Sequence, residues 1–259
     1  MTSRVAILNQ KGGVGKTTVT LGLASAAAFA GVPTLVVDID PQASATWALG
    51  VDPGSGIYTA GDALTANRSG AAGDMITEGG WGPSVWLLPG GGDLTERETD
   101  GGRANASGRL KKALEGVTDD FELVLIDCAP SLGLNTLNGL VAADLALVVV
   151  EPSAFSLRGV TSVTDTIDNV FHDLNPDLDI AGVVLNKVPA VSAEADRRID
   201  ELGRMVGRKT VWKPSIPQRV IVNQAHGERR PVHDYGWRAS EVSQVFDQLL
   251  ARLRRSARA

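Results

Sequence analysis

The sequence Lys11-Gly12-Gly13-Val14-Gly15-Lys16-Thr17-Thr18 lies between a short apolar run, Val5 to Leu8, and a helical stretch, Thr17 to Ala30. Glycines allow tight left-handed turns that point successive backbone N–H groups inward, and the start of the following helix adds the positive end of its dipole. The loop therefore predicts a polyphosphate site. A glycine turn that merely links a strand to a helix is the alternative, and the two flanking elements argue against it.

Two side chains of this loop carry the expected chemistry. Lys16 is expected to reach the β- and γ-phosphates of a nucleotide, and the hydroxyl of Thr17 is expected to ligate Mg²⁺. ATP and Mg²⁺ are therefore the expected cofactors. The residues expected to hold the nucleotide here are Lys11, Gly12, Gly13, Val14, Gly15, Lys16, Thr17 and Thr18.

Further strands are expected where the chain is continuously apolar rather than alternating, which is typical of a parallel sheet buried on both faces. Helix-like stretches separate these runs, so the order predicts an α/β fold: an open, doubly wound, mostly parallel sheet with helices on both faces. The expected strands are Thr34 to Val37, Leu123 to Ile126 and Leu145 to Val150, with Ile180 to Leu185 as a further candidate. The expected helices include Arg109 to Leu114, Leu134 to Ala142, Thr161 to Leu174 and Ala193 to Val206.

The length of 259 residues suits one large α/β domain, and we expect a single domain over residues 1–259. Residues 50–108 differ from the rest because they are rich in Gly, Ala, Ser and Asp. They carry Trp81 and Trp86 near a short expected strand, Val85 to Leu88. We expect this segment to be a loop-rich excursion from the domain and not a second domain.

Cysteine use and hydropathy indicate the compartment. Cys128 is the single cysteine, which excludes a disulfide framework within the chain and fits a reducing cytosol. The start of the chain lacks the features of a signal peptide. An uncharged stretch between Lys16 and Asp38 raises the question of a membrane span, but Gly31-Val32-Pro33 splits it into an expected helix, turn and buried strand. We therefore expect a cytoplasmic protein.

Two carboxylates stand at the end of the second expected strand, in Asp38-Ile39-Asp40-Pro41-Gln42-Ala43. Alternation places Asp38 and Asp40 on the same side of an extended backbone. Phosphoryl transfer to water needs a group that positions the nucleophile in line with the γ-phosphate, and Asp40 is the candidate. The alternative is a turn that ends a strand and caps a helix.

A third carboxylate follows four apolar residues in Leu123-Val124-Leu125-Ile126-Asp127. A carboxylate delivered to the edge of the sheet in this way can hold Mg²⁺ through a water molecule, which is the role expected of Asp127. The adjacent thiol of Cys128 suggests a redox role, but a lone thiol beside a buried strand is more often a small core residue.

Lys11 is not required by the general loop pattern. It stands at the entrance of the loop, where a cation of the same subunit has little room beside Lys16 but one reaching across a dimer face could meet a neighbour's phosphates. This arrangement resembles the deviant Walker A motif of the ParA/MinD group of P-loop ATPases. The resemblance implies that Lys11 contacts ATP in the opposite subunit of a nucleotide-sandwich dimer, and that catalysis depends on Lys11, Lys16 and Asp40.

Other segments extend the resemblance over the whole chain. The Asp38 to Gln42 segment is similar to the family's switch I, which supports Asp40, and Ala129-Pro130-Ser131-Leu132-Gly133 is similar to its switch II, with Ala129 in place of a proline. The resemblance also implies that Asn186 and Pro217 flank the adenine. By themselves these two residues predict only a strand cap and a turn.

The net charge of −5 conceals an asymmetry, because residues 1–186 carry −12 and residues 187–259 carry +7. A basic C-terminal region favours an anionic partner, although a solvated helical surface accounts for it equally well. The ParA-like branch binds DNA nonspecifically. Arg219 is the best single candidate because it follows Ile216-Pro217-Gln218, which resembles a segment of that branch whose nearby basic residues face DNA. The candidates for phosphate contacts are Arg197, Arg198, Arg204, Arg208, Lys209, Lys213, Arg219, Arg229 and Arg230.

The tail, Val242 to Arg255, has apolar residues at helical spacing and ends in arginines. Such a helix can lie on an anionic membrane, as in the MinD-like branch, but it more often packs on its own domain, and we favour packing here.

The resemblance therefore implies a ParA-like ATPase that dimerises on binding ATP, binds DNA on the nucleoid, is stimulated by a ParB-like partner, and partitions a chromosome, plasmid or other cargo. A MinD-like membrane switch and a metabolic enzyme on the same scaffold are the alternatives.

Overall fold

The computed structural model describes residues 2–54, 56–102 and 105–256. Its centre is a seven-stranded sheet in the order β3-β4-β2-β5-β1-β6-β7, in which all neighbours are parallel except the pair β3 and β4. The strands are β1 (Ser3–Leu8), β2 (Thr34–Ile39), β3 (Thr77–Glu78), β4 (Val85–Leu88), β5 (Leu123–Cys128), β6 (Leu145–Val150) and β7 (Asp179–Leu185). The predicted doubly wound, mostly parallel α/β sheet is confirmed.

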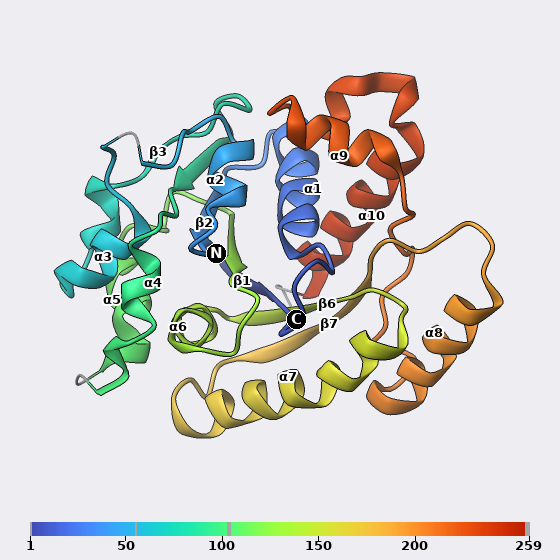
Figure 1. Ribbon diagram of the computed structural model, residues 1–259. Helices are drawn as coiled ribbons and strands as arrows, with labels where there is room; N and C mark the ends of the chain where they lie inside the picture. The colour runs from blue at the N-terminus through green and yellow to red at the C-terminus, as the bar shows by residue number, and fades with distance from the viewer. Residues whose placement is uncertain (1, 55, 103–104, 257–259) are drawn as a thin grey trace.

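Helices cover both faces of this sheet (Figure 1). One face packs against α1 (Lys16–Phe29), α9 (Val220–Gly227), η4 (Val232–Arg238) and α10 (Ser240–Ser256). The other packs against α3 (Ala60–Ala66), α5 (Arg109–Ala113), α6 (Leu134–Ala142) and α7 (Ala154–Asp173), with α8 (Ala193–Val206) beside α7. The shorter elements are α2 (Ser44–Ala48), α4 (Leu94–Arg97), η1 (Ala71–Asp74), η2 (Asp100–Gly102) and η3 (Ala106–Gly108).

Each central strand contributes to two cores because successive side chains point to opposite faces. Val5 and Ile7 of β1 face the α1 side, whereas Ala6 and Leu8 face the α6 side. All four side chains are fully buried. The continuous apolar run that predicted this strand is thus explained by the burial of both faces.

Segment 50–108 adds to the sheet at one edge. β4 pairs in parallel with β2, from Thr34 opposite Val85 to Val37 opposite Leu88, and the two-residue β3 pairs with β4. The helix α3 begins at a complete capping box, in which Thr59 and Asp62 exchange hydrogen bonds. Buried residues of α3 join the α6-side core, so the segment contributes to the same hydrophobic core as the central strands.

The C-terminal helix α10 packs along α1, which starts at the glycine-rich loop (Figure 1). Its apolar face is buried in the core on that side of the sheet, as we expected for the tail helix; this face consists of Val242, Val245, Phe246, Leu249, Leu250 and Leu253. No described helix has the length and apolar character needed to cross a bilayer.

The contact between the two helices depends on a glycine. A Cβ placed on Gly22 of α1 would lie 2.0 Å from Cε1 of the fully buried Phe246 ring. We expect Gly22→Ala to destabilise the protein by roughly 1–2 kcal/mol, because overpacking outweighs the gain in helix propensity. Urea denaturation measures this free energy.

Gly227, in α9, is the matched control because a Cβ there meets no atom within 4 Å. Gly227→Ala should leave stability unchanged or raise it, and trimming the ring in Gly22→Ala/Phe246→Leu should recover part of the stability. If Gly22→Ala is as stable as Gly227→Ala, the close packing of α10 on α1 is wrong.

Candidate nucleotide site

The glycine-rich loop starts from a fixed anchor, Asn9, which is fully buried. The Asn9 side chain donates to the Val149 carbonyl on β6 over 2.6 Å and accepts from the Lys11 N–H over 2.9 Å. It therefore ties the loop to the neighbouring strand. Sequence reasoning missed this residue, and its only signal was a polar side chain directly after an apolar strand.

The turn at the centre of the loop requires glycine at two positions. Gly13 and Gly15 have φ values of 79° and 93°, in the left-handed region. The position of Gly15 is also too crowded for a side chain, since a Cβ would lie 2.0 Å from Nδ2 of Asn186. That Nδ2 donates to the Val14 carbonyl over 2.8 Å. The loop thus packs directly against the carboxyl end of β7.

Lys187 is a second loop contact that sequence reasoning missed. Its ammonium donates to the Gly13 carbonyl over 2.6 Å, and its own backbone is left-handed, with φ of 55°. The signal available in the sequence was a basic residue directly after the strand that ends at Asn186.

Lys16, at the start of α1, is a buried cation without a protein partner. Its side chain has no hydrogen bond or ion pair with any described residue, although the residue is only 7% exposed. Burial lowers the pKa of its ammonium, and the nearby Asp127 carboxylate partly opposes that shift. A cation in this position is suited to an anion that enters from outside, such as a polyphosphate.

Asp127 is the last but one residue of β5 and lies beside the loop, where its two oxygens accept hydrogen bonds from Thr17 over 2.7 Å and from Thr20 over 2.9 Å. Burial, together with the neighbouring Asp38, raises the pKa of Asp127 to about 7. The described residues contain no group of three or more His, Cys, Asp or Glu suited to a metal. The Thr17 hydroxyl and the Asp127 carboxylate fit a magnesium ion that takes its other ligands from phosphate and water.

The two carboxylates at the end of β2 differ in their surroundings. Asp38 is fully buried and accepts from the backbone N–H of Asp40 and from both the N–H and the hydroxyl of Thr46, each over about 3 Å. Burial raises the pKa of Asp38 to about 6. The Asp38 carboxylate therefore ties the end of β2 to Thr46 in α2.

Asp40 directly follows β2 and is 9% exposed. One of its oxygens accepts from the Gln42 N–H over 2.9 Å, and the other has no partner among the described residues. The electrostatic influence of Asp40 on Lys16 places the two groups in one site. The arrangement leaves a carboxylate oxygen available to a water molecule.

Pro217 and Asn186 line one small cavity of about 110 Å³ beside the loop. Backbone hydrogen bonds between the segments of Val188 and Pro217 hold its two walls together. Lys187 and Arg219 also line the cavity, so the structure brings the two residues nominated for adenine next to the phosphate loop.

Lys11 lies at the outer end of the loop and is half buried. Its ammonium donates to the hydroxyl of Ser153, which follows β6, over 3.3 Å. Lys11 is thus more exposed than Lys16 and lies in a different part of the loop.

Five of the arginines that the sequence nominated for DNA contacts, among them Arg219, pair with carboxylates of the same chain. Arg219 makes a two-pronged ion pair with Glu241, at 2.8 Å for both bonds. The other pairs are Arg197 and Arg198 with Glu194, Arg198 with Glu201, Arg229 with Asp52 and Arg230 with Asp234. Such pairing reduces the positive potential that these side chains present to solvent.

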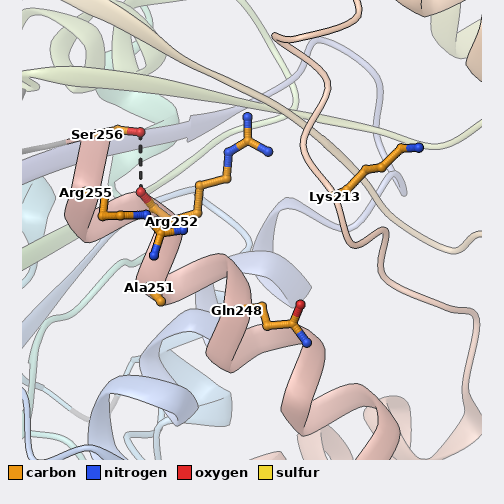
Figure 2. A pocket seen from close by; sticks show the side chains of 6 residues that line it. All are labelled: Lys213, Gln248, Ala251, Arg252, Arg255 and Ser256. Carbon is orange, nitrogen blue, oxygen red and sulfur yellow. Dashed lines mark hydrogen bonds between the residues drawn. The ribbon is translucent and has the colours of Figure 1, made fainter.

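A different basic surface lies at the end of α10, where Lys213, Arg252 and Arg255 line a pocket of about 560 Å³ (Figure 2). Its other described lining residues, Gln248, Ala251 and Ser256, carry no charge. Burial and the neighbouring Arg255 lower the pKa of Arg252. The two guanidinium groups thus repel each other, which favours an anion between them.

The loop, the buried lysine and the Thr17–Asp127 pair, all at the carboxyl edge of a parallel sheet, define a P-loop ATPase. A family model described as an AAA domain matches residues 2–180. The chain is 34% identical to the chromosome partitioning protein ParA of Myxococcus xanthus, over 88% of this chain and 80% of that protein. It is 33% identical to the sporulation initiation inhibitor protein Soj of Bacillus subtilis, over 92% and 94%. The chain belongs to the ParA/Soj family of the ParA/MinD group.

Solved structures agree with this fold. The cobyrinic acid a,c-diamide synthase from Mycobacterium smegmatis with bound ADP and magnesium has a TM-score of 0.81 at 30% identity, covering 96% of this chain and 94% of that one. The cell division ATPase MinD of Pyrococcus furiosus has a TM-score of 0.77 at 24% identity, covering 98% and 99%.

Cys128 follows Asp127 and is buried, at 1% exposure. Burial and the adjacent Asp127 raise the pKa of its thiol above the ordinary value, so the reactive thiolate is suppressed. We expect the native protein to resist labelling by a thiol reagent and the protein unfolded in guanidinium to react fully. Because the chain has one cysteine, the absorbance change reports this group alone. Rapid labelling of the native protein would contradict a purely structural role.

Proposed function

We propose that the protein is an ATPase that closes into a dimer on binding Mg-ATP, binds DNA nonspecifically in that state, and is released when a partner protein stimulates hydrolysis. The observation that carries the proposal is the pair of lysines on one loop. Lys16 is buried and has no hydrogen-bond or ion-pair partner in the part of the chain that the structure describes, whereas Lys11 lies at the outer end, bonded to Ser153. One lysine suits the phosphates of its own subunit, and the other suits a group that arrives from outside.

ATP and Mg²⁺ are the proposed cofactors, supported by the fit of Lys16, Thr17 and Asp127 to a polyphosphate and its metal. When bound, the metal ion neutralises charge that develops on the phosphates. Lys16 binds the β- and γ-phosphates, and the loop N–H groups of residues 12–18 surround them. Asp40 orients the attacking water through its available oxygen. Asn186 and Pro217 hold the adenine in the adjoining cavity.

Sedimentation with ATP or ADP tests the switch. Asp40→Ala is expected to form ATP-dependent dimers but to lose hydrolysis by about 10²-fold or more, because it removes the group that positions water. Lys16→Ala should fail to bind nucleotide, and Lys11→Ala should weaken both dimerisation and hydrolysis. Normal dimers and turnover in Lys11→Ala would rule out the shared-site dimer.

The basic pocket at the end of α10 is the observation that favours DNA among anionic partners. Its cations come from two separate segments, α10 and the loop before α9, as contacts with successive phosphates of a backbone require. The apolar face of α10 is occupied by its contact with α1, which leaves it unsuited to lie on a membrane. We therefore propose a protein of the cytoplasm, on the nucleoid, with a ParB-like activating partner and a chromosome, a plasmid or another cargo.

Removing charge from this pocket should weaken DNA binding without affecting the nucleotide site. We expect Lys213→Ala and Arg255→Ala each to lower affinity for arbitrary duplex DNA. Each should also reduce the salt dependence of binding by about one ion, because one DNA phosphate is no longer neutralised by the protein. Electrophoretic mobility shifts over a salt series, in the ATP-bound Asp40→Ala background, measure both quantities.

Arg68→Ala, remote in sequence from the basic C-terminal region and paired with Asp74, is the control. If neither Lys213→Ala nor Arg255→Ala changes DNA binding, DNA does not bind at this pocket. ATP-dependent binding to anionic vesicles without DNA binding would favour the MinD-like alternative. Monomeric protein that turns over a small-molecule substrate would favour a metabolic enzyme.

A further inference from the structure

Arg229, which the sequence nominated as a DNA contact, makes several contacts with a distant part of its own chain. Its Nε donates to the Trp47 carbonyl over 2.7 Å, and its guanidinium lies over the Trp47 ring, 5.1 Å from the ring centre. The same group pairs with Asp52 at 2.6 Å. All three contacts reach α2 or the segment that follows it.

The backbone of Arg229 is also held in place. Its carbonyl accepts a hydrogen bond from the indole N–H of Trp81 over 3.1 Å, and its φ of 55° is in the left-handed region, which is uncommon for a residue with a side chain. The side chain is 28% exposed. The turn after α9 is therefore shaped to direct this guanidinium toward α2.

The helix α2 needs such support because it has five residues and no side-chain cap at its start. A single turn of helix is not stable without tertiary contacts. On its inner side, Thr46 bonds to Asp38. On its outer side, the Arg229 contacts hold the Trp47 carbonyl at the far end of the same turn.

The position of α2 in turn determines the position of Asp40. Ala43, which precedes α2, donates its N–H to the Asp40 carbonyl over 2.9 Å, and Trp47 donates its N–H to the Ala43 carbonyl over 3.0 Å. Two successive backbone hydrogen bonds therefore connect Trp47, which Arg229 contacts, to Asp40, which is proposed to orient water. A displacement of α2 moves the backbone that carries Asp40.

An exposed ion pair alone would contribute little, since Asp52 is 70% exposed. The planar guanidinium adds a charge-assisted bond to a carbonyl and a stack on an aromatic face, which a lysine cannot reproduce together. The specific geometry thus distinguishes arginine from any other cation at this position.

We propose that Arg229 is a positioning residue for hydrolysis, acting through α2 on Asp40, and not a contact for DNA. The inference rests on the proposed role of Asp40. The proposed role of Arg229 connects the C-terminal region to the segment that carries Asp40, because Arg229 lies 182 residues along the chain from Trp47.

Steady-state ATPase assays of Arg229→Lys and Arg229→Gln test the proposal. We expect kcat to fall about tenfold in both, because small misplacement of a reacting group is costly, while KM for ATP changes by less than about twofold. Arg238→Gln is the matched control, since Arg238 is exposed on η4 and contacts Tyr235 and Gln224 instead of α2. A kcat equal to that of wild type in Arg229→Lys would overturn the proposal.

DNA binding distinguishes the two roles of Arg229. In the Asp40→Ala background with ATP, Arg229→Lys and Arg229→Gln should bind duplex DNA with unchanged affinity and salt dependence. A loss of affinity in Arg229→Gln that is restored by Arg229→Lys would make Arg229 a phosphate contact and overturn the proposal.

Hydrogen exchange separates this inference from the role of Asp40. Faster exchange of the amides of residues 43–51 is expected in Arg229→Lys, with unchanged exchange in α9 and α10, whichever residue orients the water. If Asp40→Ala keeps its turnover, the proposed function of Asp40 fails, yet the exchange result still reports whether Arg229 fixes α2. Unchanged exchange in residues 43–51 would overturn the inference itself.

Discussion

Burial of three charged groups at the carboxyl ends of neighbouring strands is the constraint on which the rest of this structure depends. Lys16, Asp38 and Asp127 are all less than a tenth exposed. Charges in such a position are tolerated only when hydrogen bonds or opposite charges compensate for the hydration that burial removes. Asp38 and Asp127 are register partners in the β2–β5 pair, so their carboxylates cannot separate. Threonines at the starts of two helices supply the donors: Thr17 and Thr20 for Asp127, and Thr46 for Asp38.

This cluster connects ligand binding to the conformation of the loop segments. Burial and then the proximity of Asp38 raise the pKa of Asp127, so this carboxylate pair favours a proton. A divalent cation beside Asp127 would favour the ionised form, and a polyphosphate would supply the partner that Lys16 lacks among residues 2–54, 56–102 and 105–256. The Asp38–Thr46 bonds extend the same cluster to α2.

The sequence predicted the central strands, the long helices and the phosphate loop because each has a local signature. Continuous apolar runs mark strands buried on both faces, and glycines mark a turn that a side chain would block. It could not predict that Val85 to Leu88 pairs with β2, since parallel pairing joins segments far apart in the chain. Nor did it indicate α2, a single turn preceded by Ala43 in the left-handed region. Asn9 and Lys187 were missed because their partners, Val149 and Gly13, lie on other elements.

The basic C-terminal region shows why a charge count and a charged surface differ. Many of its arginines neutralise local carboxylates, and Arg254 pairs with Glu122 at the entry to β5. The region also supports both sides of the nucleotide site. The helix α10 packs on α1, which begins with Lys16. The turn after α9 contacts α2, which follows Asp40, through Arg229. A ligand bound to α10 or to the turn after α9 would therefore contact the helices that directly flank the site. Under the proposed function, coupling of such a ligand to ATP hydrolysis would require only small shifts of packed helices.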